Sequence, residues 1–393
     1  MLGLGATLKK SGLITPGIVT DSLALKHNYD ASSVVPISDG AVDLNGTSDY
    51  ISTGFVPDYI HTNATIAFWV KMNDFSSSQV MGIHNNKRWY FGFDTSNLFI
   101  GVANAHNGSS LITPSPALVA GQWIHYCVTA IDGTATVYIN GVAQGTMSYT
   151  QSSSTNPSEG NKGFTIAGRN DSSGVGSEMN CNISEVVNYN VGLTANQVKT
   201  IYNGREPYNH KEGIVSGNLK TWWRMGDGAE KNKGLHSLGI GELITVSKDK
   251  NMDSSNNWGV SSANWSIDGN SLDYDGSGGG SSALDQTYPS FTQGRTYEMK
   301  FNTSANGTIL AIKDGDGSNT FVEEATYSSG TKTVTFIAPT DTDGLMFTAG
   351  ASSAAFAIDW VNVKEFNVYD MSDNTNDGRL INMTTIDFEG DTP

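Results

Sequence analysis

The sequence predicts an all-β protein made of two antiparallel β-sandwich modules of the jelly-roll type, with an N-terminal arm and one short capped helix. Apolar and polar residues alternate with a period of two in segments such as residues 65–72, which is typical of a strand with two unlike faces. The dipeptides Asn140-Gly141 and Asn306-Gly307 each separate two such segments and predict β-hairpins. Turn residues recur about every ten positions, a spacing that favours sandwiches over parallel sheets with crossover helices.

Composition excludes several classes of protein. The chain has 393 residues and a net charge of −16, with 23 basic and 39 acidic residues. An excess of acid argues against nucleic-acid binding, which needs a basic face to neutralise phosphates. A hydrophobic content of 38% argues against disorder, and the length is enough for about two or three domains.

Helical signals are rare, and the strongest lies just before residue 204. Thr194 and Gln197 form a capping-box pattern, and Gly204 supplies the stop signal. The two cysteines, Cys127 and Cys181, fall in different strand-like segments and are expected to be buried thiols. We recognise no secretory signal and no apolar run long enough to cross a bilayer, so neither secretion through a leader nor membrane insertion is expected.

Changes in composition give the predicted domain boundaries. The segment after the helix becomes irregular and carries one apolar pair, Trp222 and Trp223, and the segment after Phe366 is rich in turns and ends acidic. The predicted organisation is an N-terminal arm (1–20), a first sandwich (21–207), a linker (208–239), a second sandwich (240–366) and a C-terminal segment (367–393).

Five segments in the first half carry a family resemblance. They are DGAVDLNGTSDYIS, TIAFWVKM, GQWIHYCVTAIDGTATVYINGVAQG, FTIAGRN and CNISEVVNYNVGLTANQVKTIYNG. Their order and spacing resemble the concanavalin A-like family of laminin-G-type domains. The resemblance covers about half of the chain and implies a two-sheet jelly-roll sandwich.

The second module is similar to galactose-binding-like jelly rolls of carbohydrate-binding modules. The likeness rests on a Trp-rich opening and on the closing segment FAIDWVNVKEF. It implies a structural calcium ion near the last strand, with Asp359 and Glu242 as carboxylate ligands. Calcium needs several oxygen ligands, so two carboxylates do not define a site.

Two further resemblances concern the context of the modules. Segments LKTWWRMGDG and VYDMSDNTNDGRLINM, on either side of the second module, look like halves of one segment of virion proteins, so Trp222 and Trp223 should pack near residues 370–383. If so, the second module is an insertion, which loops tolerate well. The first thirty residues resemble the opening of structural proteins of tailed bacteriophages, particularly marine ones.

Catalytic patterns are absent from the sequence. The Glu-x-Asp-x-x-Glu strand of retaining glucanases does not occur, and Glu185 is expected to make a structural hydrogen bond rather than to act as a general acid. The histidines lack zinc-site spacing, and no Walker loop or nucleophile elbow is present. DGDGSN (314–319) and SDNTNDG (372–378) have calcium-loop character, but tight turns are the preferred interpretation.

Sugar binding needs an aromatic face together with amides or carboxylates for the hydroxyls. Two clusters have this composition. The candidate carbohydrate-binding residues are His84, Asn85, Asn86, Arg88 and Trp89 in the first module, and Asn257, Trp258, Asn264 and Trp265 in the second. The alternative for each tryptophan is a place in the hydrophobic core.

Together these features predict a non-enzymatic structural protein of a tailed-bacteriophage virion. It would be a capsid decoration, fibre or tail-associated component, anchored to other virion proteins through the N-terminal arm, with modules that bind cell-surface glycans. A homo-oligomer, taken as a trimer, is expected. The alternatives are a polysaccharide-degrading enzyme or its carbohydrate-binding accessory, and a capsid cement without a ligand.

Overall fold

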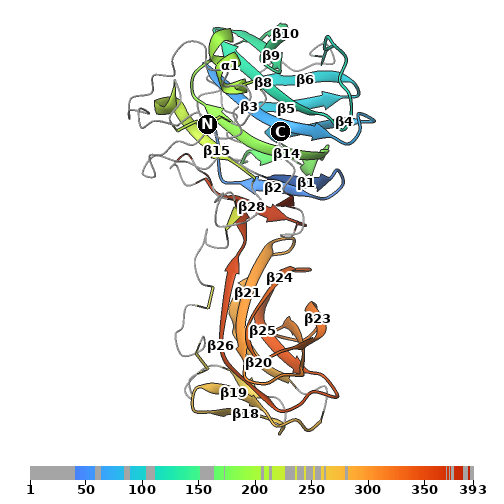
Figure 1. Ribbon diagram of the computed structural model, residues 1–393, viewed down its shortest axis with the longest axis vertical. Helices are drawn as coiled ribbons and strands as arrows, with labels where there is room; N and C mark the ends of the chain where they lie inside the picture. The colour runs from blue at the N-terminus through green and yellow to red at the C-terminus, as the bar shows by residue number, and fades with distance from the viewer. Residues whose placement is uncertain are drawn as a thin grey trace, which may run out of the picture. The chain divides into compact units, whose positions relative to one another are not determined.

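The computed structural model shows two β-sandwiches and draws the strands of the first from both ends of the sequence (Figure 1). All described residues lie within residues 37–393, which form one compact unit. The structure describes residues 40–57, 63–83, 89–102, 111–150, 163–171, 173–204, 208–211, 215–225, 235–236, 243–244, 251–252, 258–260, 263–278, 282–368, 370, 372, 376–383 and 388–389.

The largest sheet of the first sandwich is antiparallel throughout its paired strands. In spatial order its strands are β10 (Val142–Ser148), β9 (Thr134–Ile139), β8 (Trp123–Ile131), β3 (Ala64–Met72), β14 (Asn180–Tyr189), β1 (Ala41–Asn45) and β29 (Phe388–Glu389). Strand β15 (Leu219–Trp223) pairs with the second half of β14. This arrangement confirms the predicted alternation over residues 65–72, because Ile66, Phe68 and Val70 enter the core.

Two further sheets complete the first sandwich. One contains β13 (Gly174–Gly176), β12 (Arg169–Asp171), β4 (Ser78–Ile83), β5 (Trp89–Asp94), β6 (Asn97–Val102) and β7 (Leu111–Ile112). The other contains β11 (Thr165–Ile166), β2 (Tyr50–Thr53), β28 (Gly378–Ile381), β27 (Asn367–Val368) and β16 (Leu235–His236). All pairings are antiparallel except that between β12 and β4.

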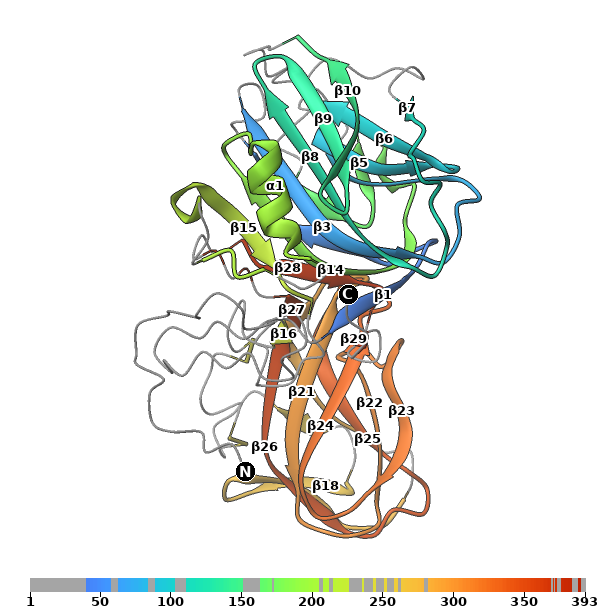
Figure 2. The ribbon, with the colours of Figure 1, turned by 45° about the horizontal axis from the view of Figure 1, so that its top comes forward.

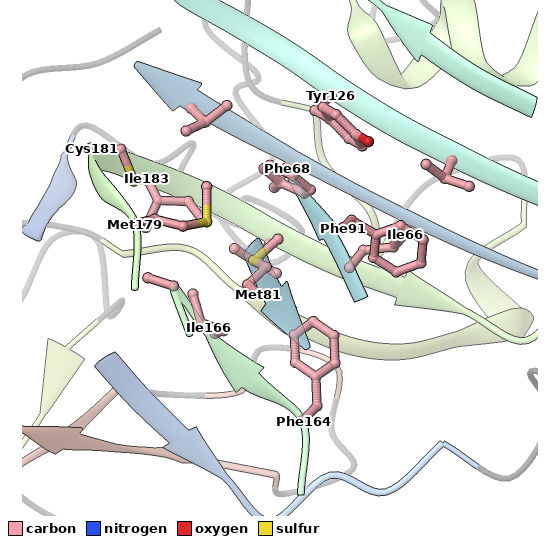
Figure 3. Close-up of a cluster of buried hydrophobic side chains, with 14 of the residues drawn as sticks. Ile66, Phe68, Met81, Phe91, Tyr126, Phe164, Ile166, Met179, Cys181 and Ile183 are labelled. Atoms are coloured by element: carbon pink, nitrogen blue, oxygen red, sulfur yellow. The ribbon is translucent and has the colours of Figure 1, made fainter. Parts of the chain in front are cut away.

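The core of the first sandwich lies between its sheets (Figure 3). Phe68 and Tyr126 stack with their ring centroids 4.9 Å apart, and Phe93 meets Tyr126 edge-on. Cys181 lies among the core residues and Cys127 is buried on the opposite face of the sheet. Both thiols are free, as predicted, and burial raises the pKa of each.

A short helix, α1 (Ala195–Tyr202), lies over the outer face of the largest sheet (Figure 2). The predicted capping box is confirmed, because the Thr194 hydroxyl accepts from the Gln197 amide and the Gln197 side chain accepts from Thr194 N. Asn203 ends the helix in the left-handed conformation, one residue before the predicted Gly204. Among the described residues, no helix has the length and apolar character needed to span a membrane.

The second sandwich has two five-stranded antiparallel sheets (Figure 1). The first sheet contains β17 (Gly259–Val260), β20 (Ser282–Phe291), β25 (Thr342–Ala349), β22 (Thr308–Asp314) and β23 (Thr320–Tyr327). The second contains β18 (Trp265–Asp268), β19 (Ser271–Tyr274), β26 (Phe356–Glu365), β21 (Thr296–Thr303) and β24 (Gly330–Ile337). A separate hydrophobic core fills the space between them.

The two Asn-Gly predictions had different outcomes. Asn140 and Gly141 both have positive φ and join β9 to β10 as a hairpin, as predicted. The hairpin prediction at Asn306-Gly307 was wrong, because β21 pairs with β24 and β26 whereas β22 pairs with β23 and β25. The turn carries the chain from one sheet to the other, and a turn signal gives no information about which sheet the next strand joins.

The second sandwich is inserted into the first. Trp223 forms an isolated bridge with Asp370, the Trp222 amide donates to Asp370 Oδ1 (2.9 Å), and Trp223 Nε1 donates to the Asn376 carbonyl (2.8 Å). These contacts confirm the expected packing of the tryptophan pair. They also correct the predicted boundaries, since the linker (208–239) supplies β15 and the C-terminal segment (367–393) supplies β27, β28 and β29.

Candidate functional site

The loop proposed for sugar binding in the first module lies mostly outside the described residues. This is the case for His84, Asn85, Asn86 and Arg88. Trp89 is described, and it is a core residue with no exposed surface. Its Nε1 donates to Asn188 Oδ1 (3.1 Å) and its ring meets Phe91 edge-on, so no face of this indole is open to a sugar.

The tryptophans proposed in the second module are also core residues. Trp258 is 5% exposed and stacks on Phe347, and Trp265 is 3% exposed and packs against Tyr274. The alternative of a place in the core therefore holds for both. Asn264 uses its side-chain amide to donate to the Ser277 and Gly278 carbonyls, which ties down a turn, and Asn257 lies outside the described residues.

The described residues do not assemble a calcium site. Glu242 lies outside them, and Asp359 Oδ2 accepts a hydrogen bond from the Asn302 side-chain amide (2.5 Å). The part of the chain that the structure describes contains no group of three acidic, histidine or cysteine side chains placed to hold a metal. Asp314 closes a turn by accepting from the Asn319 backbone and side-chain amides. We therefore derive no function through calcium.

Glu185 has the structural role expected of it and lies in the middle of β14. Its Oε2 accepts a short hydrogen bond from Trp222 Nε1 (2.5 Å), and its side chain is 2% exposed. Its backbone has positive φ at a bulge in the pairing with β3. The fully buried Arg224 lies 3.7 Å away, measured from Nε to Glu185 Oε1. This carboxylate is too enclosed to reach a glycosidic bond.

Exposure separates the tryptophans into two groups. The structure describes all eight, and six are at most 5% exposed: Trp69, Trp89, Trp222, Trp223, Trp258 and Trp265. Trp123, in the first sandwich, and Trp360, in the second, are half-buried and belong to neither core. These two indoles are the ones that retain surface for a ligand.

Trp360 faces away from the core because β26 contains a bulge. Ile358 and Val361 both enter the core, so Asp359 and Trp360 between them lie on the outer face. The pairing with β21 shifts register at the same place, between Phe301 and Thr303. A bulge of this kind places two residues opposite one and re-aims their side chains.

Polar side chains surround Trp360 on the same face. By register, Lys300 pairs with Asn362 and Glu298 with Lys364, while Asn302 donates to Asp359. Lys300 Nζ lies 3.1 Å from Glu298 Oε1. The next strand, β24, adds the hydroxyls of Thr331, Thr333 and Thr335 to this face. We call the outer face of β26, β21 and β24 the Trp360 face.

The chemistry of the Trp360 face suits a polyhydroxylated ligand. An indole offers an apolar surface to the C–H face of a sugar ring, while amides, carboxylates and an ammonium group bind hydroxyls. The nearby charges are balanced, with two carboxylates, Asp359 and Glu298, and two cations, Lys300 and Lys364. Strand positions hold these groups more firmly than a loop would.

The sequence contains one signal for Trp360. In a regular strand, core residues follow each other at every second position, and here Ile358 and Val361 are three apart. The two residues between them, Asp359 and Trp360, must share one side of the strand. Aromatic content in loops does not identify such a site.

Comparison with known proteins identifies the fold of the first sandwich. A family model for the concanavalin A-like lectin/glucanase superfamily matches residues 45–199. The first sandwich therefore has the concanavalin A-like lectin/glucanase fold. No curated protein matches the chain.

Several solved structures are similar to parts of the chain. A Bacteroides ovatus protein to which carbohydrate binding is ascribed is 17% identical, with a TM-score of 0.36, over 48% of this chain and 52% of that one. The chain thus spans about half of that protein. A Limulus polyphemus pentraxin is 15% identical (TM-score 0.32; 46% and 86% covered). The C-terminal family 6 carbohydrate-binding module of a Zobellia galactanivorans laminarinase is 14% identical (TM-score 0.21; 28% and 89% covered).

Proposed function

We propose that the chain is a carbohydrate-binding protein and that its second sandwich holds a glycan on the Trp360 face. The observation that carries the proposal is the bulge in β26, which places a half-buried indole beside Asp359, Asn302 and Lys300. The lectin fold of the first sandwich supports sugars as the ligand class. An open sheet face suits a segment of a polysaccharide chain better than a single enclosed monosaccharide.

Replacing Trp360 with alanine tests this proposal. Truncating an aromatic anchor costs about 2 kcal/mol or more of binding free energy, so we expect affinity for the best oligosaccharide from a glycan array to fall by more than about tenfold. Isothermal titration calorimetry measures the change. The melting temperature should stay close to that of the unmodified protein, because Trp360 is outside the core.

A matched control is available in the same sandwich. Val260 is 44% exposed on β17, in the other sheet, and its replacement by alanine should leave glycan affinity unchanged. Equal affinity together with equal binding stoichiometry of the Trp360→Ala variant and the unmodified protein would disprove the role of this face. Mass spectrometry of the oligosaccharide after incubation separates binding from the enzymatic alternative, in which the sugar would be cleaved.

We further propose that this binding serves attachment of a bacteriophage particle to its host. The support is the resemblance of the first thirty residues to phage structural proteins, and those residues lie outside the described part of the chain. Weak sites repeated on a particle would gain strength through multivalency. Cryo-electron microscopy of the particle tests the location: copies with the Trp360 face turned outward support attachment, and a face packed against shell subunits favours a cement.

A further inference from the structure

We propose that the first sandwich carries a second glycan-binding face, centred on Trp123, and that both faces take a neutral polysaccharide. The inference rests on the proposed function and extends it from one site to two. Trp123 is half-buried and, with Trp360, is one of the two indoles that retain exposed surface.

Trp123 lies on the side of the largest sheet that faces away from the core. It opens β8, and the next residue, Ile124, enters the core, so alternation directs Trp123 and His125 outward. His125 is 2% exposed because Tyr202 of the helix packs on it and on Trp69. Trp123 is half-buried, two positions beyond His125 at the start of the strand.

A row of polar side chains continues from Trp123 across three neighbouring strands. Trp123 pairs with Lys71, Lys71 with Asn182, and Asn182 with Asp43. Directly paired residues lie on the same face, about 4.8 Å apart from strand to strand, so the row is roughly as long as two or three sugar rings. We call these four residues the Trp123 row.

Lys71 is already in contact with the indole. Its Nζ lies 5.7 Å from the centroid of the Trp123 ring, within the range of a cation–π interaction. A sugar packed against the indole would bring its hydroxyls within reach of this ammonium group. Further along the row, Asp43 adds a half-buried carboxylate, and Asn182 between Lys71 and Asp43 is only 4% exposed, so the indole, Lys71 and Asp43 are the groups that offer surface to a ligand.

The Trp123 row repeats the composition of the Trp360 face. Each combines one half-buried indole with a lysine, an asparagine and an aspartate, and each lies on a sheet surface turned away from a core. In both, cations and carboxylates are balanced. The chain as a whole carries a charge of −16, which repels polyanionic glycans electrostatically and has no such effect on the binding of neutral glycans.

The stoichiometry of binding tests the inference. Calorimetric titration of the full chain with a neutral oligosaccharide should give two sites, and the Trp123→Ala and Trp360→Ala variants should each give one. The double variant should give none. Trp123→Phe, which keeps an aromatic ring, should retain the second site at reduced affinity, and Val142→Ala, at a 61%-exposed position on β10, should retain both sites.

The outcomes separate this inference from the proposed function. One site in the unmodified protein, unchanged by Trp123→Ala and removed by Trp360→Ala, would overturn the second face and leave the proposed function intact. Failure to bind any glycan would overturn both. Tighter binding of a uronic-acid or sulfated oligosaccharide than of its neutral counterpart would overturn the assigned ligand class. If Trp123→Ala is unstable by circular dichroism, Lys71→Ala provides the same test, with the second site expected to weaken at least severalfold.

Discussion

A chain that ends at Phe366 is expected to lose the folded first sandwich, even though every residue matched by the lectin family model is still present. The truncation removes β28, which lies between β2 and β27 in the five-stranded sheet. It also removes Leu380 and Met383, both fully buried in the core of the first sandwich. Truncating one large core side chain to alanine lowers the free energy of unfolding by about 2–5 kcal/mol.

The loss extends to polar contacts. Asp370, which is 1% exposed, accepts hydrogen bonds from the backbone amides of Trp222, Ser372 and Asn376. Without Asp370, the buried Trp222 amide loses this acceptor, at a cost of about 1–3 kcal/mol. The summed loss from this hydrogen bond and the missing core residues is comparable to the free energy of unfolding of a typical domain, about 5–15 kcal/mol. Circular dichroism and calorimetry should show that the first sandwich no longer melts cooperatively.

An internal deletion provides the matched control. His236 and Asn367 are cross-strand partners, so the inserted sandwich leaves and re-enters the first at adjacent backbone positions. Replacing residues 237–365 with a short Gly/Ser linker keeps β27, β28 and β29, and we expect this variant to melt cooperatively. A truncated chain that melts as cooperatively as the internally deleted one would contradict the interpretation.

Local signals in the sequence predicted local structure well. The capping box depends on residues three apart, and the Asn140-Gly141 hairpin depends on two adjacent residues that tolerate positive φ. The insertion was predicted from the resemblance of LKTWWRMGDG and VYDMSDNTNDGRLINM to two halves of one segment, and not from a local signal. The failure at Asn306-Gly307 has the opposite cause, because sheet membership depends on strands far away in the sequence.

The candidate sites show where sequence reasoning stops. Trp69 and Trp123 lie on the same outer face of one sheet, yet Trp69 is covered by Tyr202 of the helix and Trp123 is half-buried. Alternation within a strand gives the face of a residue and contains no information about what covers that face. Position next to a polar loop is equally uninformative. Trp89 follows such a loop in the sequence, yet it is a core residue whose Nε1 donates to Asn188.

Removal of one member of the Glu185–Arg224 pair is expected to destabilise the first sandwich more than removal of both. The two side chains are 2% and 0% exposed, with Arg224 Nε 3.7 Å from Glu185 Oε1. Removing one partner of a buried ion pair costs about 3–5 kcal/mol, whereas replacing both partners with neutral groups of similar size can be nearly neutral. Trp222 connects the pair to β15, because its Nε1 donates to Glu185 Oε2.

A double-mutant cycle measures this coupling. Arg224→Met keeps the length of the side chain and removes the charge, and Glu185→Gln keeps an oxygen acceptor for Trp222 Nε1. We expect the free energy of urea unfolding to fall by about 3–5 kcal/mol in Arg224→Met and by less in the double variant, because the neutral amide that Glu185→Gln introduces no longer requires a cation. If the effects of the two substitutions simply add, the two side chains are not coupled and the interpretation is contradicted.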